Sequence, residues 1–124
     1  MARRAGVTLG GITLVDSAAE AEIERTAAAL VAQRGDRLMS ADRDRYARDP
    51  LFQAAARVRA GLADSFVAGA TRTTADVLRA SLWLVGLAPG VKTLSSFFLM
   101  ALGSTPAAER VIVFADCAVV PDPS

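Results

Sequence analysis

The segment Gly69–Arg79 combines residue types that bind anions, in the order in which a strand, a loop and a helix would present them. The small residues Gly69-Ala70 end an apolar run and allow a ligand to approach the backbone. Arg72 and the hydroxyls of Thr73 and Thr74 then stand where a helix is expected to begin. Backbone amides at a helix start, together with hydroxyls and a guanidinium, suit a phosphate group.

The alternative for this segment is an ordinary capping box, in which Thr73 and Asp76 only stabilise the start of an amphipathic helix. Arg79 lies about two turns into that helix, where it either reaches a second phosphate or faces solvent. The spacing matches neither a Walker loop nor the GxGxxG fingerprint of dinucleotide-binding proteins. The residues alone leave both interpretations open.

Three other places carry polar groups that could serve a site, and each has a structural alternative. Asp116 follows an apolar run, where open α/β sheets gather their ligand groups, and alternatively it caps a turn. Ser95 and Ser96 precede another apolar run and either line a pocket or begin a buried strand. The charged run 34–48 is either a solvated surface or contains an arginine that binds phosphate.

The composition excludes several classes of site. Since the chain has no histidine, it cannot form histidine-dependent metal sites or Ser-His-Asp and Cys-His catalytic groups, and no metal site is expected. Its single cysteine, Cys117, cannot form an internal disulfide and is interpreted as a small buried hydrophobe rather than a nucleophile. The 14 basic and 13 acidic residues give a net charge of +1, which provides no global attraction to nucleic acid or to a membrane surface.

Apolar periodicity and capping signals predict strands that alternate with helices. Ser17 is expected to cap the first helix with Glu20, and Asp49 to cap another helix that begins at Pro50. The predicted strands cover Gly11–Asp16, Phe66–Ala70, Thr93–Leu99 and Val111–Ala115, and the predicted helices run from Ser17 to Arg34, from near Ser40, from Pro50 to Gly61 and from Thr73 through Val85. This order predicts an α/β fold with an open, mostly parallel sheet and flanking helices. Glycine and proline divide the most apolar stretch, so no transmembrane segment is expected.

Several of these segments together resemble the phosphate acetyltransferase (phosphotransacetylase) family. The matching blocks are Ala63–Ala70, Thr73–Arg79, Ala88–Val91 followed by Leu94–Met100, and Val113–Val119 followed by Pro121-Asp122-Pro123. The blocks have the order and spacing of the family, and the resemblance covers residues 7–124. The chain departs from the family pattern at Arg72, where a histidine is usual, at Ala80, where a proline is usual, and at Val120, where an asparagine is typical.

The resemblance implies a transferase that exchanges an acetyl or short acyl group between coenzyme A and inorganic phosphate, by direct attack and without a covalent enzyme intermediate. It also implies a two-lobed fold like that of isocitrate and isopropylmalate dehydrogenases, a cytoplasmic homodimer, no permanently bound cofactor, and no nucleic-acid or membrane partner. Arg79 matches a family arginine that handles CoA and phosphate, and Arg34 is expected to match another. The full candidate set for binding these substrates is Arg79, Thr73, Thr74, Arg72, Arg34, Ser95, Ser96 and Asp116.

Domains of this family are much longer than 124 residues. Residues 1–124 are therefore expected to form the middle of the catalytic domain, without its N-terminal start and with the catalytic loop downstream of Ser124. Two alternatives remain. One is a non-catalytic, truncated relative that binds CoA or phosphate or acts as an interaction module, and the other is an α/β domain whose resemblance is structural only.

Overall fold

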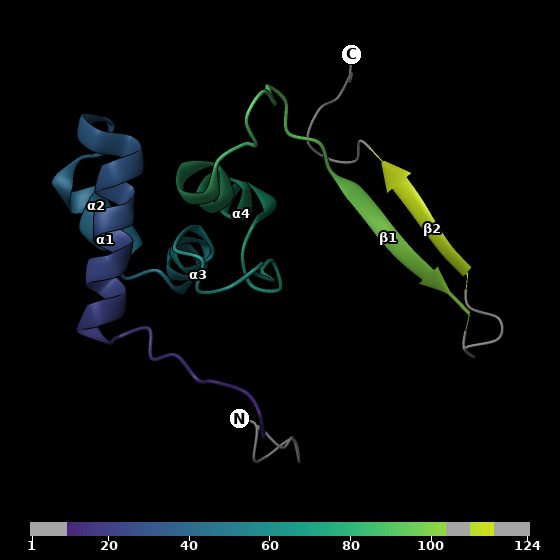
Figure 1. Cartoon of the computed structure of the whole chain (residues 1–124), viewed down its shortest axis with the longest axis horizontal. Helices are drawn as coiled ribbons and strands as arrows, with labels where there is room; N and C mark the ends of the chain where they lie inside the picture. The colour runs from purple at the N-terminus through teal and green to yellow at the C-terminus, as the bar shows by residue number, and fades with distance from the viewer. Residues whose placement is uncertain (1–9, 104–109, 116–124) are drawn as a thin grey trace. The chain divides into compact units, whose positions relative to one another are not determined.

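The computed structural model describes residues 10–103 and 110–115 of the chain, which divides after Gly86 into two compact units. The first unit is helical and the second contains a two-stranded sheet (Figure 1). In chain order the elements are α1 (Glu20–Arg34), the 3₁₀ turn η2 (Gly35–Arg37), α2 (Ser40–Ala47), α3 (Pro50–Arg59), α4 (Thr74–Ala80), the π-helical turn η3 (Ser81–Val85), β1 (Phe97–Leu102) and β2 (Arg110–Ala115). The structure thus confirms an α/β chain among the described residues.

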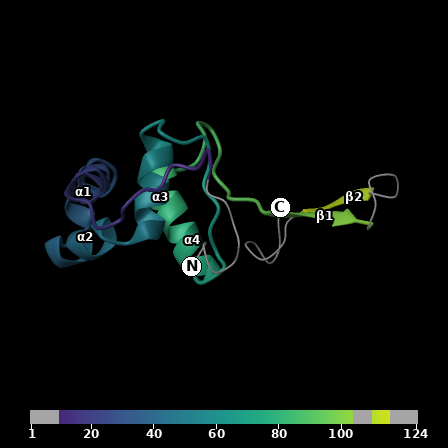
Figure 2. The ribbon, with the colours of Figure 1, turned by 90° about the horizontal axis from the view of Figure 1, so that it is seen from below.

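The core of the first unit lies where α3 packs between the α1–α2 pair and the segment formed by α4 and η3 (Figure 2). Leu30 from α1, Phe52 from α3 and Leu84 from η3 are almost completely buried there. The rings of Tyr46, Phe52 and Trp83 extend this core, with centroids 4.4 to 6.0 Å apart. Aromatic rings at such separations stabilise a small core beyond the area that they bury.

Local capping signals set several of the helix boundaries, as predicted. The Asp49 carboxylate accepts a hydrogen bond from the Leu51 amide, and Pro50 occupies the first position of α3. Helix α1 ends at Gly35, whose φ of +51° is a left-handed conformation that glycine adopts without a steric penalty. The prediction that Ser17 caps α1 is wrong, because Ala19 is the N-cap residue and no side chain bonds to it.

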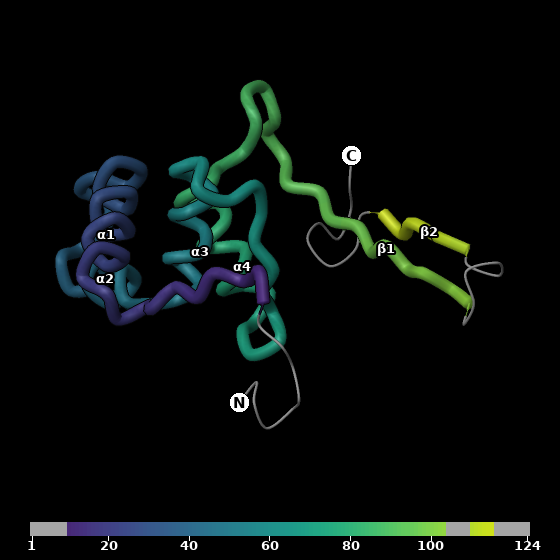
Figure 3. Tube along the Cα trace, turned by 60° about the horizontal axis from the view of Figure 1, so that its bottom comes forward, coloured from purple at the N-terminus to yellow at the C-terminus, as the bar shows by residue number. Residues whose placement is uncertain are grey.

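The lead-in to α1 is instead organised by Asp16 and Gln53. The Asp16 side chain accepts a hydrogen bond from the Ala18 amide at 2.9 Å, and its carbonyl accepts one from Ala19 at 3.1 Å. Gln53, from α3, donates to the Ser17 carbonyl at 2.9 Å. At Ser17, this contact ties the lead-in to α1, purple in Figure 3, to the start of α3.

The apolar periodicity predicts a regular α-helix that continues to Val85, but α4 ends at Ala80. After Ala80 it widens into the π turn η3, in which the Gly86 amide donates to the Ser81 carbonyl at 2.9 Å. The side chains that face the core also differ from the predicted stripe. Ala80 and Leu84 are fully buried, whereas Leu82, which the periodicity places in the apolar stripe, is 43% exposed.

A buried ion pair joins α1 to α3. One carboxylate oxygen of Glu22 accepts hydrogen bonds from the guanidinium groups of Arg25 and Arg57, the latter at 2.9 Å. The hydrogen bond from Arg25 lowers the pKa of Glu22 below its ordinary value; burial acts in the opposite direction, and Arg57 adds to the lowering. Glu22 therefore stays ionised in the folded protein although its side chain is largely buried.

The second unit contains an antiparallel pair in which Phe97 lies opposite Ala115 and Leu102 opposite Arg110. Side chains directly opposite each other share a face, so Leu99 and Val113 lie on one face and Phe98 and Phe114 on the other. These four apolar side chains are each at least half exposed. A sheet that is apolar on both faces is typical of a strand pair that is covered on both sides in the mature fold.

Two of the four predicted strands are wrong. Residues 11–16 and 66–70 belong to no strand, because the described part of the chain supplies no strand that pairs with either segment. The other two form, as β1 and β2, with β1 beginning four residues later than predicted. They pair antiparallel, so the predicted parallel arrangement is not what the described strands adopt.

Every helix in the described ranges is too short or too polar to span a bilayer.

We predict that Glu22→Gln lowers the free energy of unfolding by about 1 kcal/mol near neutral pH. Because the folded-state pKa of Glu22 is lowered, its contribution is complete above the ordinary value of 4.5 and is lost as the pH falls through the folded-state value. Urea unfolding at several pH values should therefore show a weaker loss of stability in acid for Glu22→Gln than for the wild type. Glu24→Gln, an exposed change on the same helix, is the control, and an unchanged acid slope in Glu22→Gln would contradict the assignment.

The exposed faces of the hairpin lead to a second prediction. The 124-residue chain should self-associate in sedimentation experiments, because uncovered apolar strands pair with other chains. Leu99→Lys places a charge on one face of the hairpin and should reduce this association. Val67→Lys changes a fully exposed apolar residue in the first unit and serves as the matched control. A monomeric wild-type chain, or an equal effect of the two substitutions, would count against the hairpin as the cause.

Candidate functional site

A groove of about 360 Å³ lies between the start of α3 and the loop that precedes α4. Pro50, Leu51 and Ala54 form one wall, and residues 67–72 form the other. Gly69 in this loop has a φ of +113°, and a methyl group added there would meet nothing within 4 Å. The conformation rather than crowding therefore requires glycine. The groove lies at the segment that the sequence marks for anion binding.

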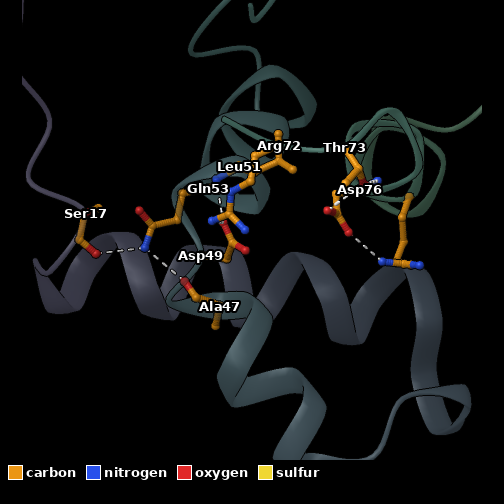
Figure 4. A network of polar contacts seen from close by, with 9 residues as sticks. Ser17, Ala47, Asp49, Leu51, Gln53, Arg72, Thr73 and Asp76 are labelled. Atoms are coloured by element: carbon orange, nitrogen blue, oxygen red, sulfur yellow. Dashed lines mark hydrogen bonds and ion pairs between the residues drawn. The ribbon is translucent and has the colours of Figure 1, made fainter. Parts of the chain in front are cut away.

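Arg72 stands at the rim of the groove and is held by Asp49. Its Nη2 atom donates to Asp49 Oδ1 at 2.8 Å, and the same oxygen accepts the capping hydrogen bond from Leu51 at 3.0 Å (Figure 4). The Arg72 side chain is 41% exposed and that of Asp49 is 18% exposed. The carboxylate thus has two tasks: it caps α3 and it holds an arginine from a loop 23 residues away in sequence.

The start of α4 forms the capping box that the sequence offers as the alternative interpretation. The Asp76 amide donates to Thr73 Oγ1 at 3.2 Å, and the Thr73 hydroxyl donates to Asp76 Oδ2 at 2.8 Å. That second hydrogen bond lowers the pKa of Asp76 below its ordinary value; desolvation opposes it, and the charge of Arg79 lowers it further. Thr74 is the first residue of the helix. A negative carboxylate therefore occupies part of the expected anion cradle.

Arg79 is the partner of Asp76 on the next turn of α4, with Nη1 3.0 Å from Asp76 Oδ1. Its side chain is 40% exposed. Since a guanidinium carries five N–H donors, this ion pair leaves donors on Arg79 that can bind an anion. Arg72 and Arg79 therefore share one arrangement, in which a carboxylate fixes one end of the guanidinium and part of the group faces solvent.

Among the described residues, Arg72 is the predicted site residue that lines the groove, and Thr73, Thr74 and Arg79 follow it in the chain. Arg34, at the end of α1, stacks its guanidinium 4.7 Å from the centre of the Trp83 ring, against the aromatic core. Its Nε atom is buried without a partner in the described part of the chain. Ser95 and Ser96 belong to the second unit, in the segment before β1. Asp116 lies outside the described residues.

The sequence analysis does not identify two residues that shape the site. Asp49 was expected only to cap α3, and Gln53 was assigned no role. Gln53 is 4% exposed and uses both amide hydrogens, one for the Ser17 carbonyl and one for the Ala47 carbonyl at 3.0 Å (Figure 4). It thereby fixes the turn that carries Asp49. The Asp-Pro dipeptide was a signal for the helix start, but nothing local to it indicates Arg72 as a partner.

The described residues contain no cluster of three or more Asp, Glu, His or Cys side chains that could hold a metal ion. The groups available at the groove are guanidinium N–H donors, hydroxyls, backbone amides and apolar carbon atoms. Such groups can bind and orient a phosphorylated ligand and can stabilise negative charge that develops on it.

Comparisons with known proteins agree with this chemistry. The sequence model of the family described as phosphate acetyl/butaryl transferase matches residues 1–124. The phosphate acetyltransferase of Paracoccus denitrificans is 41% identical over 120 residues, which cover 95% of this chain and 38% of that protein. The phosphate acetyltransferase of Treponema pallidum is 39% identical over 131 residues, which cover 99% of this chain and 38% of that protein.

Among solved structures, the chain is similar to the EutD phosphotransacetylase from Staphylococcus aureus. The TM-score is 0.73 at 23% sequence identity, and the similarity covers 98% of this chain and 36% of that chain. The likeness shows that the two share a fold over this region. The chain spans a little over a third of the length of these relatives.

We predict that Gln53→Glu destabilises the first unit by about 1–3 kcal/mol, because a carboxylate cannot donate to the carbonyls of Ser17 and Ala47. Thermal unfolding followed by circular dichroism measures the change. Gln33→Glu makes the same substitution at an exposed position of α1 and should leave the stability nearly unchanged. Equal stabilities of the two variants would show that the double hydrogen bond of Gln53 contributes nothing.

Proposed function

Because this chain belongs to the phosphate acetyl/butaryl transferase family, we propose that the whole protein transfers an acetyl or other short acyl group between coenzyme A and inorganic phosphate. In the forward direction acetyl-CoA and phosphate give acetyl phosphate and free CoA. The observation that carries this proposal is the family match over residues 1–124, together with relatives named phosphate acetyltransferase that are 39% and 41% identical. The groove with Arg72 at its rim supports it, because phosphate and CoA are both anionic.

The reaction requires a phosphate oxygen to attack the carbonyl carbon of the thioester. A C–O bond forms, the C–S bond breaks, and the CoA sulfur leaves as a thiolate that takes up a proton. Negative charge passes from the phosphate through the carbonyl oxygen to the sulfur. Fixed cations and N–H donors accelerate such a step by orienting the reactants and stabilising the charge in the transition state, without a covalent enzyme intermediate.

We assign the binding of the phosphate-bearing substrates to Arg72, Thr73, Thr74 and Arg79. The support is that Arg72 and Arg79 are each anchored by a carboxylate while their side chains remain about 40% exposed. Anchored guanidinium groups lose less conformational entropy when they bind an anion than free ones do. Arg34 is proposed as a further arginine of the substrate site, with Ser95, Ser96 and Asp116 contributing from the later part of the chain.

The whole protein is proposed to have the two-lobed fold of the isocitrate and isopropylmalate dehydrogenases. In that fold an open, mostly parallel sheet would supply pairing partners for residues 11–16 and 66–70 and would cover the apolar faces of β1 and β2. We also propose that it is a cytoplasmic homodimer that uses CoA as a substrate and holds no permanent cofactor. Detection of the full-length protein as a dimer in sedimentation would support the assembly.

We predict that Arg79→Gln in the full-length protein lowers kcat/KM for acetyl phosphate formation about 100-fold, because a charged donor to the substrate is lost. Arg79→Lys keeps the charge and should lose less. The measurement is acetyl phosphate formed from acetyl-CoA and phosphate. Arg43→Gln is the matched control, since Arg43 also pairs with an aspartate and has a side chain that is 40% exposed.

The same assays test the proposed function itself. A wild-type protein that forms no acetyl phosphate but binds CoA would be a binding module instead. A protein that does neither would overturn the proposal entirely. Full activity in Arg79→Gln would leave the reaction in place and remove Arg79 from the site.

A further inference from the structure

Building on the proposed function, we infer that Asp49 is a positioning residue: it orients Arg72 so that the free edge of the guanidinium binds a phosphoryl group of a ligand in the groove. The inference rests on a shared oxygen. Asp49 Oδ1 accepts from both the Leu51 amide and Arg72 Nη2, at 3.0 and 2.8 Å. One carboxylate thus connects the helix that forms one wall of the groove to the cation at its rim.

The carboxylate is the fixed member of this pair. Its backbone is held on both sides, because the Asp49 amide donates to the Tyr46 carbonyl at 3.1 Å and the Gln53 amide donates to the Asp49 carbonyl at 3.0 Å. Its side chain is further tied down by the Leu51 amide. Arg72, in contrast, lies in a loop outside any helix or strand and is much more exposed than Asp49. The carboxylate therefore determines where the guanidinium lies.

The groove determines the class of ligand. Of its lining residues only Arg72 is charged; the others are the apolar residues Pro50, Leu51 and Ala54 and a loop segment of mostly small residues, 67–71. This combination fits a ligand with a largely uncharged body and a phosphoryl group at one end. A guanidinium has two edges, Nε–Nη2 and Nη1–Nη2, that bind oxyanions through paired N–H groups. The bond to Asp49 uses one of the two Nη2 hydrogens, which leaves the other edge for the phosphoryl oxygens.

Two effects of Asp49 on an anionic ligand have opposite signs, and this makes the inference testable. Through its charge alone the carboxylate repels the anion, so removing the charge would tighten binding. Through position the carboxylate prevents the long Arg72 side chain from adopting other rotamers, so removing the ion pair would weaken binding. We expect the positional effect to be larger because both charges stand partly in water, where repulsion is screened.

The experiment measures ligand binding by the full-length protein with titration calorimetry. Asp49→Asn keeps a good N-cap for α3 and removes the ion pair; Asp49→Ser does the same and serves if the first variant unfolds. The probes are CoA, dephospho-CoA and inorganic phosphate. We expect Asp49→Asn to raise the Kd of at least one probe about 3- to 10-fold, Arg72→Gln to raise it at least as much, and the double variant to resemble Arg72→Gln.

The probes identify the source of the phosphoryl group. A loss for CoA but not for dephospho-CoA assigns the 3′-phosphate, a loss for both assigns the diphosphate, and a loss for inorganic phosphate assigns the phosphate substrate. Asp44→Asn removes the carboxylate of another arginine–aspartate pair and should leave every Kd unchanged.

Unchanged or tighter binding in a folded Asp49 variant would overturn the inference. So would an Asp49→Asn substitution that weakens binding equally in the wild type and in the Arg72→Gln variant. Because these are binding measurements, they decide the role of Asp49 even if the protein forms no acetyl phosphate. Failure of the proposed reaction would instead appear in the wild-type activity assay.

Discussion

The turn between α2 and α3 is the constraint on which the helical unit depends. Gln53 donates to the carbonyl of Ala47 and to that of Ser17, so one side chain joins the end of α2, the start of α3 and the lead-in to α1. Asp49, inside the same turn, caps α3 and holds Arg72. Leaving a buried amide without its hydrogen-bond partners costs more free energy than a solvent-exposed hydrogen bond contributes. This small polar group therefore fixes elements that would otherwise be joined only by apolar packing.

Features with local causes were predictable from the sequence. The caps at Asp49 and Thr73 and the glycine that ends α1 were read correctly, because each depends on residues within one helical turn. The predictions of strands at 11–16 and 66–70 are wrong, because a strand forms only beside a partner and its own residues do not indicate where that partner lies. The π turn after Ala80 also has no simple sequence signal, and Leu84 rather than Leu82 is buried in the core.

The same distinction holds for the candidate site. The residues between Gly69 and Arg79 identified the loop, and the groove does lie beside it. What they could not provide was the neighbour from α3, since Asp49 and Arg72 are 23 positions apart and meet only through the fold. Nor do they show that the Arg34 guanidinium packs over the Trp83 ring, whereas that of Arg72 pairs with a carboxylate. Residue type alone does not distinguish these two environments.

The absence of histidine gives the pairing of arginines with carboxylates a further consequence. A histidine in place of Arg72 would gain and lose its charge near neutral pH, whereas a guanidinium stays charged throughout that range. In the Asp76–Arg79 pair, the hydrogen bond from Thr73 and the charge of Arg79 lower the pKa of the Asp76 carboxyl. Both the positive charge and its orientation therefore persist across neutral pH, and the first group in the Asp76–Arg79 pair to fail on acidification is the carboxylate rather than the cation.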